Sequence, residues 1–286
     1  MTQDKEITSN TLDAKFSRYA FKKHILLEGD KGSGKTHYAS RWTTTFPITK
    51  IFIGGHEQFE SIDFLGHFMQ SSSGVLLWKD GALSQAFRSA KSGQKVLLII
   101  DEMLRIPKRE LNLLVSALSP ISGHYVLRTG RALKEENGIA IEEVLAIPSS
   151  HLWVIGTTNV GSDYAIDTID EALIDRFKPI RKETTIKEIE QILRAEATKK
   201  GFALIEVQKL LTFYTKMQHF RKINILHHKV NLRHLKEALE FASCEQEIKI
   251  IIEDSILLWV DREKDGNPDQ EQMTTIHSIL KKVWKP

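Results

Sequence analysis

The chain has 286 residues, of which 41% are hydrophobic and 27% charged, the composition of an ordinary globular protein of one or two domains. Its net charge of +3 is too small for a strongly basic nucleic-acid-binding domain. A single cysteine, Cys244, excludes an internal disulfide, and the longest apolar run, Val96–Ile100, is far shorter than the roughly 20 residues of a membrane helix. Because Met1–Asn10 also lacks the apolar core of a secretory signal, we expect a cytoplasmic protein.

In the first part of the chain, short apolar runs alternate with amphipathic segments of helical length, which is typical of a parallel sheet covered by helices. Strands of such a sheet are buried on both faces, so their apolar runs are continuous. The predicted strands are His24–Glu28, Lys50–Ile53, Val96–Ile100 and His151–Thr157. The predicted helices are Lys35–Thr45, Gly81–Lys91 and Arg109–Leu118.

Two segments interrupt this alternation. Gly54–Lys79 separates the second strand from the helix that follows, and it contains a turn at Ser71–Gly74. Gly123–Ile147 contains two apolar runs separated by a polar stretch, a pattern that predicts a hairpin with a long tip. We therefore expect two insertions in the α/β domain.

Beyond about Thr185 the strand signals stop and only helical spacing remains. We therefore predict an α/β domain over residues 1–185 and a helical domain with a C-terminal tail over residues 186–286. Basic side chains cluster in Lys216–Lys236, which fits a solvated helical face or a subunit contact. The predicted helices of this part are Ile186–Thr198, Leu204–Gln218, Leu232–Ala242, Glu247–Val260 and Thr274–Trp284.

The segment Gly29–Thr36 matches the pattern G-x-x-x-x-G-K-[ST] in full, between a predicted strand and a predicted helix. Glycines let the backbone curl so that its N–H groups point at phosphate oxygens, and the helix N-terminus adds positive potential. Lys35 is expected to reach the β- and γ-phosphates, and the Thr36 hydroxyl is placed to bind Mg²⁺. The residues that we expect to bind the nucleotide are Gly29, Asp30, Lys31, Gly32, Ser33, Gly34, Lys35 and Thr36.

Two carboxylates, Asp101 and Glu102, follow directly on the apolar run Val96–Ile100. Ligands of open α/β sheets bind at the carboxyl ends of the strands. Asp101 is therefore expected to hold Mg²⁺ through its water shell, and Glu102 to polarise the attacking water. Taken alone, an Asp-Glu pair at this place also fits a helix cap.

A third strand ends in Thr157-Thr158-Asn159. Asn159 comes to the same edge of the sheet, where its amide could orient the lytic water or the γ-phosphate. The alternative is that Asn159 is an ordinary turn residue, a position that suits asparagine.

Together these segments resemble the Walker A, Walker B and sensor 1 elements of AAA+ ATPases. Glu171–Phe177 (EALIDRF) is similar to the A-x-x-D-R-F segment of the MoxR branch, and Ser61–Gly66 followed by Asp80–Leu83 also looks like that branch. The resemblance covers about Lys22 to Ala242. It implies a P-loop NTPase fold, with a parallel α/β core followed by a C-terminal helical lid.

The resemblance also assigns roles to two arginines. Arg176 would be the arginine finger, which reaches the γ-phosphate bound by a neighbouring subunit and stabilises its developing charge. A surface salt bridge with Asp175 or Glu171 is the alternative for this side chain. Arg233 aligns with sensor 2 at the start of a lid helix and would act on its own nucleotide or on a neighbour's.

The implied function is that of a MoxR-like remodelling ATPase, which uses ATP and Mg²⁺. It would work as a homo-oligomeric ring, a hexamer by analogy, on a protein client or with a partner that carries a von Willebrand A domain. One alternative is a nucleic-acid-associated AAA+ motor of a restriction or transposition system. The other is a slow switch that assembles on binding nucleotide. ATP rather than GTP is indicated by the family resemblance alone.

Overall fold

A computed structural model describes residues 11–42, 46–159, 171–257 and 260–285. The polar start Met1–Asn10 and the end of the predicted helix Lys35–Thr45 lie outside the described residues. The chain divides into two compact units, which we treat separately: Met1–Asp30 with Gly34–Lys182, and Lys31–Ser33 with Glu183–Pro286. Within the described residues, no helix is both long and apolar enough to cross a membrane.

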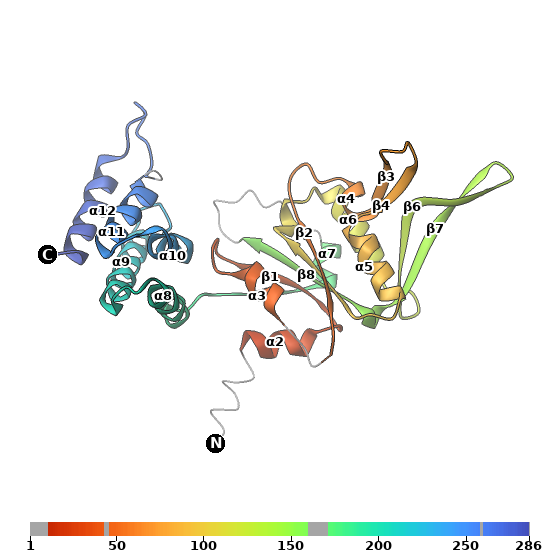
Figure 1. Ribbon diagram of the computed structural model, residues 1–286, viewed down its shortest axis with the longest axis horizontal. Helices are drawn as coiled ribbons and strands as arrows, with labels where there is room; N and C mark the ends of the chain where they lie inside the picture. Colours follow the sequence, from red (N-terminus) through yellow and green to blue (C-terminus); the bar gives the residue numbers. More distant parts are fainter. Residues whose placement is uncertain (1–10, 43–45, 160–170, 258–259, 286) are drawn as a thin grey trace, which may run out of the picture. The chain divides into compact units, whose positions relative to one another are not determined.

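The first unit is built on a parallel sheet (Figure 1). Its five strands have the order β2-β5-β8-β1-β9. Four of these strands are the predicted ones, and the predicted class of a parallel α/β core with C-terminal helices is confirmed. The fifth, β9, was missed because its sequence, FKPIR, is half polar and contains Pro179, which an edge strand tolerates. The strands are β1 (His24–Gly29), β2 (Thr49–Gly54), β5 (Val96–Asp101), β8 (Leu152–Asn159) and β9 (Phe177–Arg181).

Helices cover both faces of this sheet, and the interior strand β5 shows how. Leu97 and Ile99 pack on one side with residues of α2 (Leu12–Tyr19) and α3 (Lys35–Arg41). Leu98 and Ile100 pack on the other side with residues of α4 (Ser61–Leu65), α5 (Ala82–Lys91) and α6 (Lys108–Ala117). Both sets are fully buried, which explains the uninterrupted apolar run in the sequence.

The two predicted insertions are both β-hairpins. The first pairs β3 (Gly66–Gln70) with β4 (Leu76–Asp80), and the second pairs β6 (His124–Glu136) with β7 (Ile139–Pro148). The prediction of a long tip in the second hairpin was wrong. Its strands run on to a two-residue turn at Asn137 and Gly138, whose φ angles of 53° and 77° are those of the tight hairpin turn that Asn-Gly favours.

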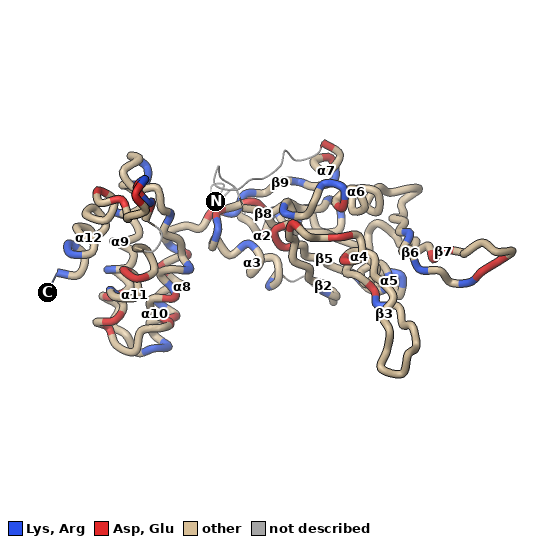
Figure 2. Tube along the Cα trace, turned by 90° about the horizontal axis from the view of Figure 1, so that it is seen from above, with Lys and Arg blue, Asp and Glu red and all other residues tan. Residues whose placement is uncertain are grey.

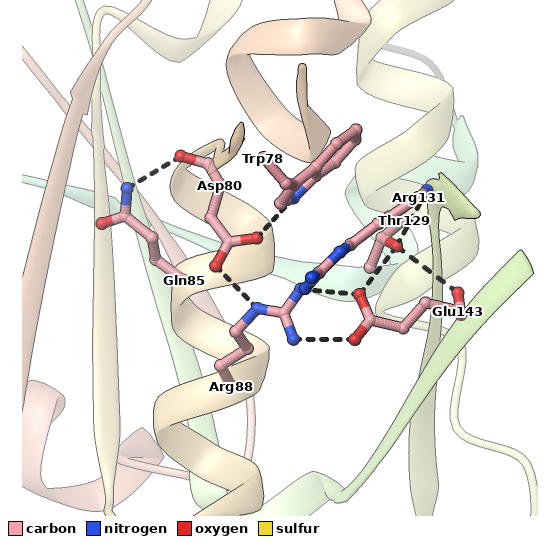
Figure 3. Close-up of polar contacts among 7 residues, drawn as sticks. All are labelled: Trp78, Asp80, Gln85, Arg88, Thr129, Arg131 and Glu143. Carbon is pink, nitrogen blue, oxygen red and sulfur yellow. Dashed lines mark hydrogen bonds and ion pairs between the residues drawn. The ribbon is translucent and has the colours of Figure 1, made fainter. Parts of the chain in front are cut away.

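A polar cluster around Arg88 joins α5 to both hairpins (Figure 3). The Arg88 guanidinium donates to Asp80 at the end of β4 at 2.6 Å, and to both carboxylate oxygens of Glu143 in β7 at 2.8 and 2.6 Å. The Trp78 indole also donates to Asp80, and the Thr129 hydroxyl in β6 donates to Glu143. Helix α5 therefore ties both insertions to the sheet.

The second unit is helical, as predicted. Its helices are α8 (Ile186–Lys200), α9 (Leu204–Lys222), α10 (Leu232–Phe241), α11 (Glu245–Leu257) and α12 (Gln270–Val283). They enclose one apolar core, to which each contributes fully buried side chains. α8 begins with a reciprocal pair of hydrogen bonds between Thr185 and Glu188, a capping box that fixes its start.

Candidate functional site

The candidate site lies at the carboxyl edge of the sheet, where β1, β5 and β8 end side by side. Parallel register places Gly29 level with Asn159, and Ile100 level with Gly156. The residues that follow, Asp101 and Thr157, are therefore neighbours. Side chains that are distant in the sequence meet here because parallel strands present their carboxyl ends at one edge.

The loop after β1 has the conformation that the glycine pattern predicts. Gly32 and Gly34 both have φ of +77°, a left-handed conformation that is strained for residues with a side chain. Gly34 is also the N-cap of α3, so the loop leads directly into a helix N-terminus. The hydroxyl of Ser33 is buried and has no hydrogen-bond partner among the described residues. A polar atom in this state fits a loop that binds phosphate oxygens.

Lys35 is buried at the centre of the site. Its Nζ donates to the carbonyl oxygens of Gly29 at 3.0 Å and Asp30 at 2.9 Å, and to Asn159 Oδ1 at 2.8 Å. Burial lowers the pKa of Lys35 from its ordinary value, and the nearby Asp101 carboxylate partly opposes this shift. The loop lysine and Asn159, 124 positions apart in the sequence, are thus in direct contact.

Two hydroxyls converge on one carboxylate oxygen. Thr36 Oγ1 and Thr157 Oγ1 both donate to Asp101 Oδ1 at 2.5 Å. Hydroxyl and carboxylate oxygens are the ligands that Mg²⁺ prefers. The donor atoms of Thr36 and Asp101 therefore fit the expected magnesium site, in the chemistry of the atoms and in their closeness.

Glu102 sits just beyond, in an unusual backbone conformation. Its φ of 48° and ψ of 43° place it in the left-handed region, which non-glycine residues seldom adopt. Its carboxylate accepts a hydrogen bond from Arg105 at 2.7 Å, and the same guanidinium also lies 3.7 Å from Glu57. The group expected to polarise water is thus paired with an arginine that has a second acidic neighbour.

Of the two predicted arginines, Arg176 is not at this carboxyl edge, and Arg233 belongs to the second unit. Arg176 closes α7 (Glu171–Arg176), and its guanidinium donates to Val115 O at 2.9 Å, Ala172 O at 2.6 Å and Ser119 Oγ at 2.5 Å. These oxygens belong to its own helix, to α6 and to the residues just after α6, and all are uncharged. Arg233 is exposed in the first turn of α10 in the second unit, where its N–H donates to Asn231 Oδ1 at 2.9 Å.

Sequence reasoning missed two residues that contact the predicted ones. The sequence pattern indicated Thr157 only as part of the strand end Thr157-Thr158-Asn159, and it indicated no role for Arg105. The spacing of Arg105 three positions after Glu102 could have indicated the ion pair. By contrast, the contact between Thr157 and Asp101 depends on the register of two strands, which no local pattern reports.

The comparison with protein families agrees with this geometry. Residues 24–177 match the family model described as AAA domain (dynein-related subfamily). Among solved structures, a mutant of RuvB from Thermotoga maritima is similar, with 15% sequence identity and a TM-score of 0.48. The aligned part covers 93% of this chain and 72% of that one.

Proposed function

This chain belongs to the AAA domains of the dynein-related subfamily, and we propose that it is a Mg²⁺-dependent ATPase of the MoxR type that remodels a protein client as a ring. The observation that carries the proposal is that the loop, Asp101 and Asn159 meet on one sheet edge, where Lys35 donates a hydrogen bond to Asn159 and Thr36 donates one to Asp101. Three motifs far apart in sequence thereby form one constellation with a phosphate-binding loop. Membership of the family supports nucleotide hydrolysis as the reaction.

Each residue of the constellation has a distinct task in hydrolysis. The loop N–H groups and Lys35 would bind the phosphates, with Lys35 exchanging its carbonyl partners for phosphate oxygens. Thr36 and Asp101 would hold Mg²⁺, which neutralises charge on the phosphates when bound. Asn159, already beside Lys35, would orient the attacking water, and Glu102 would polarise it.

Assembly into a ring is supported by the place of Arg176. Among the described residues, the Arg176 guanidinium donates to uncharged oxygens of α6, α7 and Ser119, and it can exchange these for a phosphate without separating an ion pair. We therefore assign Arg176 as the arginine finger that completes a neighbour's site, and Arg233 as a sensor 2 residue. An active site shared between copies requires a closed ring, and a hexamer is the form expected by analogy.

The hairpin β3–β4 is the segment that we expect to contact a client. Between His67 and Trp78 it contains no Asp, Glu, Lys or Arg, so it is uniformly tan in Figure 2. Phe68, Leu76 and Leu77 are at least half exposed there. Exposed apolar side chains of this kind mark protein contacts. A partner with a von Willebrand A domain is expected from the MoxR resemblance.

The proposal is tested by the solution mass of the Glu102→Gln variant, measured by light scattering with and without Mg-ATP. The variant should bind nucleotide but hydrolyse it slowly, so that an ATP-bound ring accumulates. Adding Lys35→Ala to the same variant removes the phosphate ligand and provides the control. A shift to several subunits that needs both Lys35 and Mg-ATP would support the proposal. A persistent monomer at micromolar concentration would rule out a self-assembling ring.

One observation favours a second candidate, a slow nucleotide-dependent switch. The Arg105 guanidinium donates a hydrogen bond to the Glu102 carboxylate, and a carboxylate held in this way is less available to polarise water. Such a protein would bind ATP and assemble, yet turn over slowly until the pair opens. Turnover of the wild-type ring separates the two, because a remodelling ATPase should approach the roughly 1–10³ s⁻¹ of ordinary enzymes.

A further inference from the structure

One buried hydroxyl connects the two carboxylate residues at the end of β5. Thr157 Oγ1 donates to Asp101 Oδ1 at 2.5 Å and accepts the backbone N–H of Glu102 at 3.1 Å. The residue is 1% exposed, so the threonine side chain is shielded from water. A side chain of β8 therefore touches the predicted Mg²⁺ ligand and the predicted water-polarising residue at once.

The chemistry of a hydroxyl fixes the direction of both bonds. Thr157 has one proton, and a carboxylate oxygen can only accept, so that proton must go to Asp101. The oxygen is then the acceptor for Glu102 N–H, which is a backbone donor that needs a partner when buried. The two bonds are complementary, and neither can be reversed.

Thr36 donates to the same oxygen of Asp101, but its role differs. A threonine oxygen that binds a cation must turn a lone pair toward the metal, which changes where its proton points. Thr157 lies on a central strand of the sheet and has no such second task. It is therefore the hydroxyl that can hold Asp101 Oδ1 in one place throughout a reaction cycle.

The bond to Glu102 has a separate consequence. Glu102 is in the left-handed backbone region, a conformation that persists only when its surroundings hold it. Its N–H is held by Thr157, so the hydroxyl stabilises this conformation and with it the direction of the carboxylate. The position of Asp101 and the direction of the Glu102 carboxylate thus both depend on the Thr157 hydroxyl.

We propose that Thr157 is a positioning residue that sets Asp101 and Glu102 together, so that Mg²⁺ binding and hydrolysis both depend on its hydroxyl. This inference rests on the proposed function, since it assumes that Mg-ATP is the ligand. Thr157 itself would touch neither the metal nor the nucleotide.

The next residue provides a matched control. Thr158 is also buried, at 4% exposed, and it points to the opposite side of β8 because side chains alternate along a strand. The bond from its hydroxyl to Asn159 O is long, at 3.4 Å. Thr157→Val and Thr158→Val therefore remove the same atom from adjacent buried positions, and only the first disturbs Asp101 and Glu102.

The experiment measures ATP affinity in excess Mg²⁺ and in EDTA, and then kcat and the Mg²⁺ concentration that gives half-maximal turnover. In Thr157→Val we expect an unchanged affinity in EDTA, a half-maximal Mg²⁺ concentration raised about tenfold, and kcat reduced at least about tenfold. Thr158→Val should resemble the wild type. Thr157→Ser keeps the hydroxyl and should restore most of both losses. If Thr157→Val does not fold, Thr157→Ala provides the same test without the extra methyl group.

Equal Mg²⁺ dependence in Thr157→Val and wild type would overturn the inference, and so would equal losses in the two valine variants. A wild type that binds no nucleotide would instead refute the proposed function. In that case, crystal structures of nucleotide-free wild type and Thr157→Val still decide the positioning role. We expect the Asp101 carboxylate and the Glu102 backbone to change between them. Unchanged positions of both would refute it.

Discussion

Arg88 and Glu143 form a two-pronged ion pair, with the terminal guanidinium nitrogens 2.8 and 2.6 Å from the two carboxylate oxygens. The pair joins α5 to the second hairpin, and Asp80 extends it to the first. Hydrogen bonds from Arg88 hold the pKa of Glu143 below its ordinary value, and those from Glu143 and Asp80 raise the pKa of Arg88. Both insertions are thus attached to the nucleotide-binding unit at one side chain.

Replacing Arg88 should loosen both hairpins together. Arg88→Ala leaves Glu143, whose side chain is only 10% exposed, without its guanidinium partner, which we expect to destabilise the unit by about 1–3 kcal/mol. Hydrogen exchange should speed up in β4 and β7 alike. Arg128→Ala is the control, because Arg128 is 74% exposed and its ion pair with Glu142 is longer, at 3.3 Å. Faster exchange in one hairpin alone would argue against a shared attachment.

The same pair gives stability a defined pH dependence. The pKa of Glu143 is lower in the folded state than its ordinary 4.5, so the pair contributes fully above that pH and is lost as pH falls through the folded value. The free energy of unfolding of wild type and Glu143→Gln should therefore differ by a constant amount above about pH 5.5. Below about pH 4.5 the difference should shrink. Chemical denaturation across this range measures it, and a difference that grew on acidification would have the wrong sign.

Freeing Glu102 from Arg105 should raise basal ATP turnover. The pair is exposed, so the gain is small, about two- to fivefold in kcat, with ATP affinity unchanged. Glu57→Gln should act in the opposite direction, because Arg105 then has one acidic neighbour left. Arg109→Ala removes a nearby arginine that is 77% exposed, against 56% for Arg105, and serves as the control. Reduced turnover in Arg105→Ala would mean that the guanidinium assists hydrolysis.

Mixing two inactive variants tests whether Arg176 acts on a neighbour. Arg176→Ala should lower kcat by roughly 10³-fold or more if the residue is an arginine finger. A ring of Arg176→Ala and Glu102→Gln subunits contains some sites with an intact Glu102 and a neighbour's intact Arg176. We expect activity to reappear in the mixture and to peak near equal amounts. No recovery in mixed rings of verified composition would place Arg176 outside the neighbour's site.

The sequence predicts the features of this fold that leave a local pattern, and it does not predict contacts that depend on how the strands pair. Continuous apolar runs such as Val96–Ile100 identify central strands because burial on both faces requires them. β9 carries no such signal, since its Pro179 and its two charged residues suit an edge. The phosphate-binding loop is recognisable because its chemistry is local. The cluster around Asp101 is not, because Thr157 reaches it through strand register.

The left-handed backbone of Glu102 lowers the stability of the folded protein at a residue whose carboxylate the proposed hydrolysis requires. Glycine adopts such a conformation without strain and asparagine does so more readily than most, whereas glutamate bears a cost of order 1 kcal/mol. A substitution that relieves this cost also removes the carboxylate. Selection for thermal stability alone, in a laboratory library of this chain, should therefore enrich variants at position 102 that fold better and no longer hydrolyse ATP.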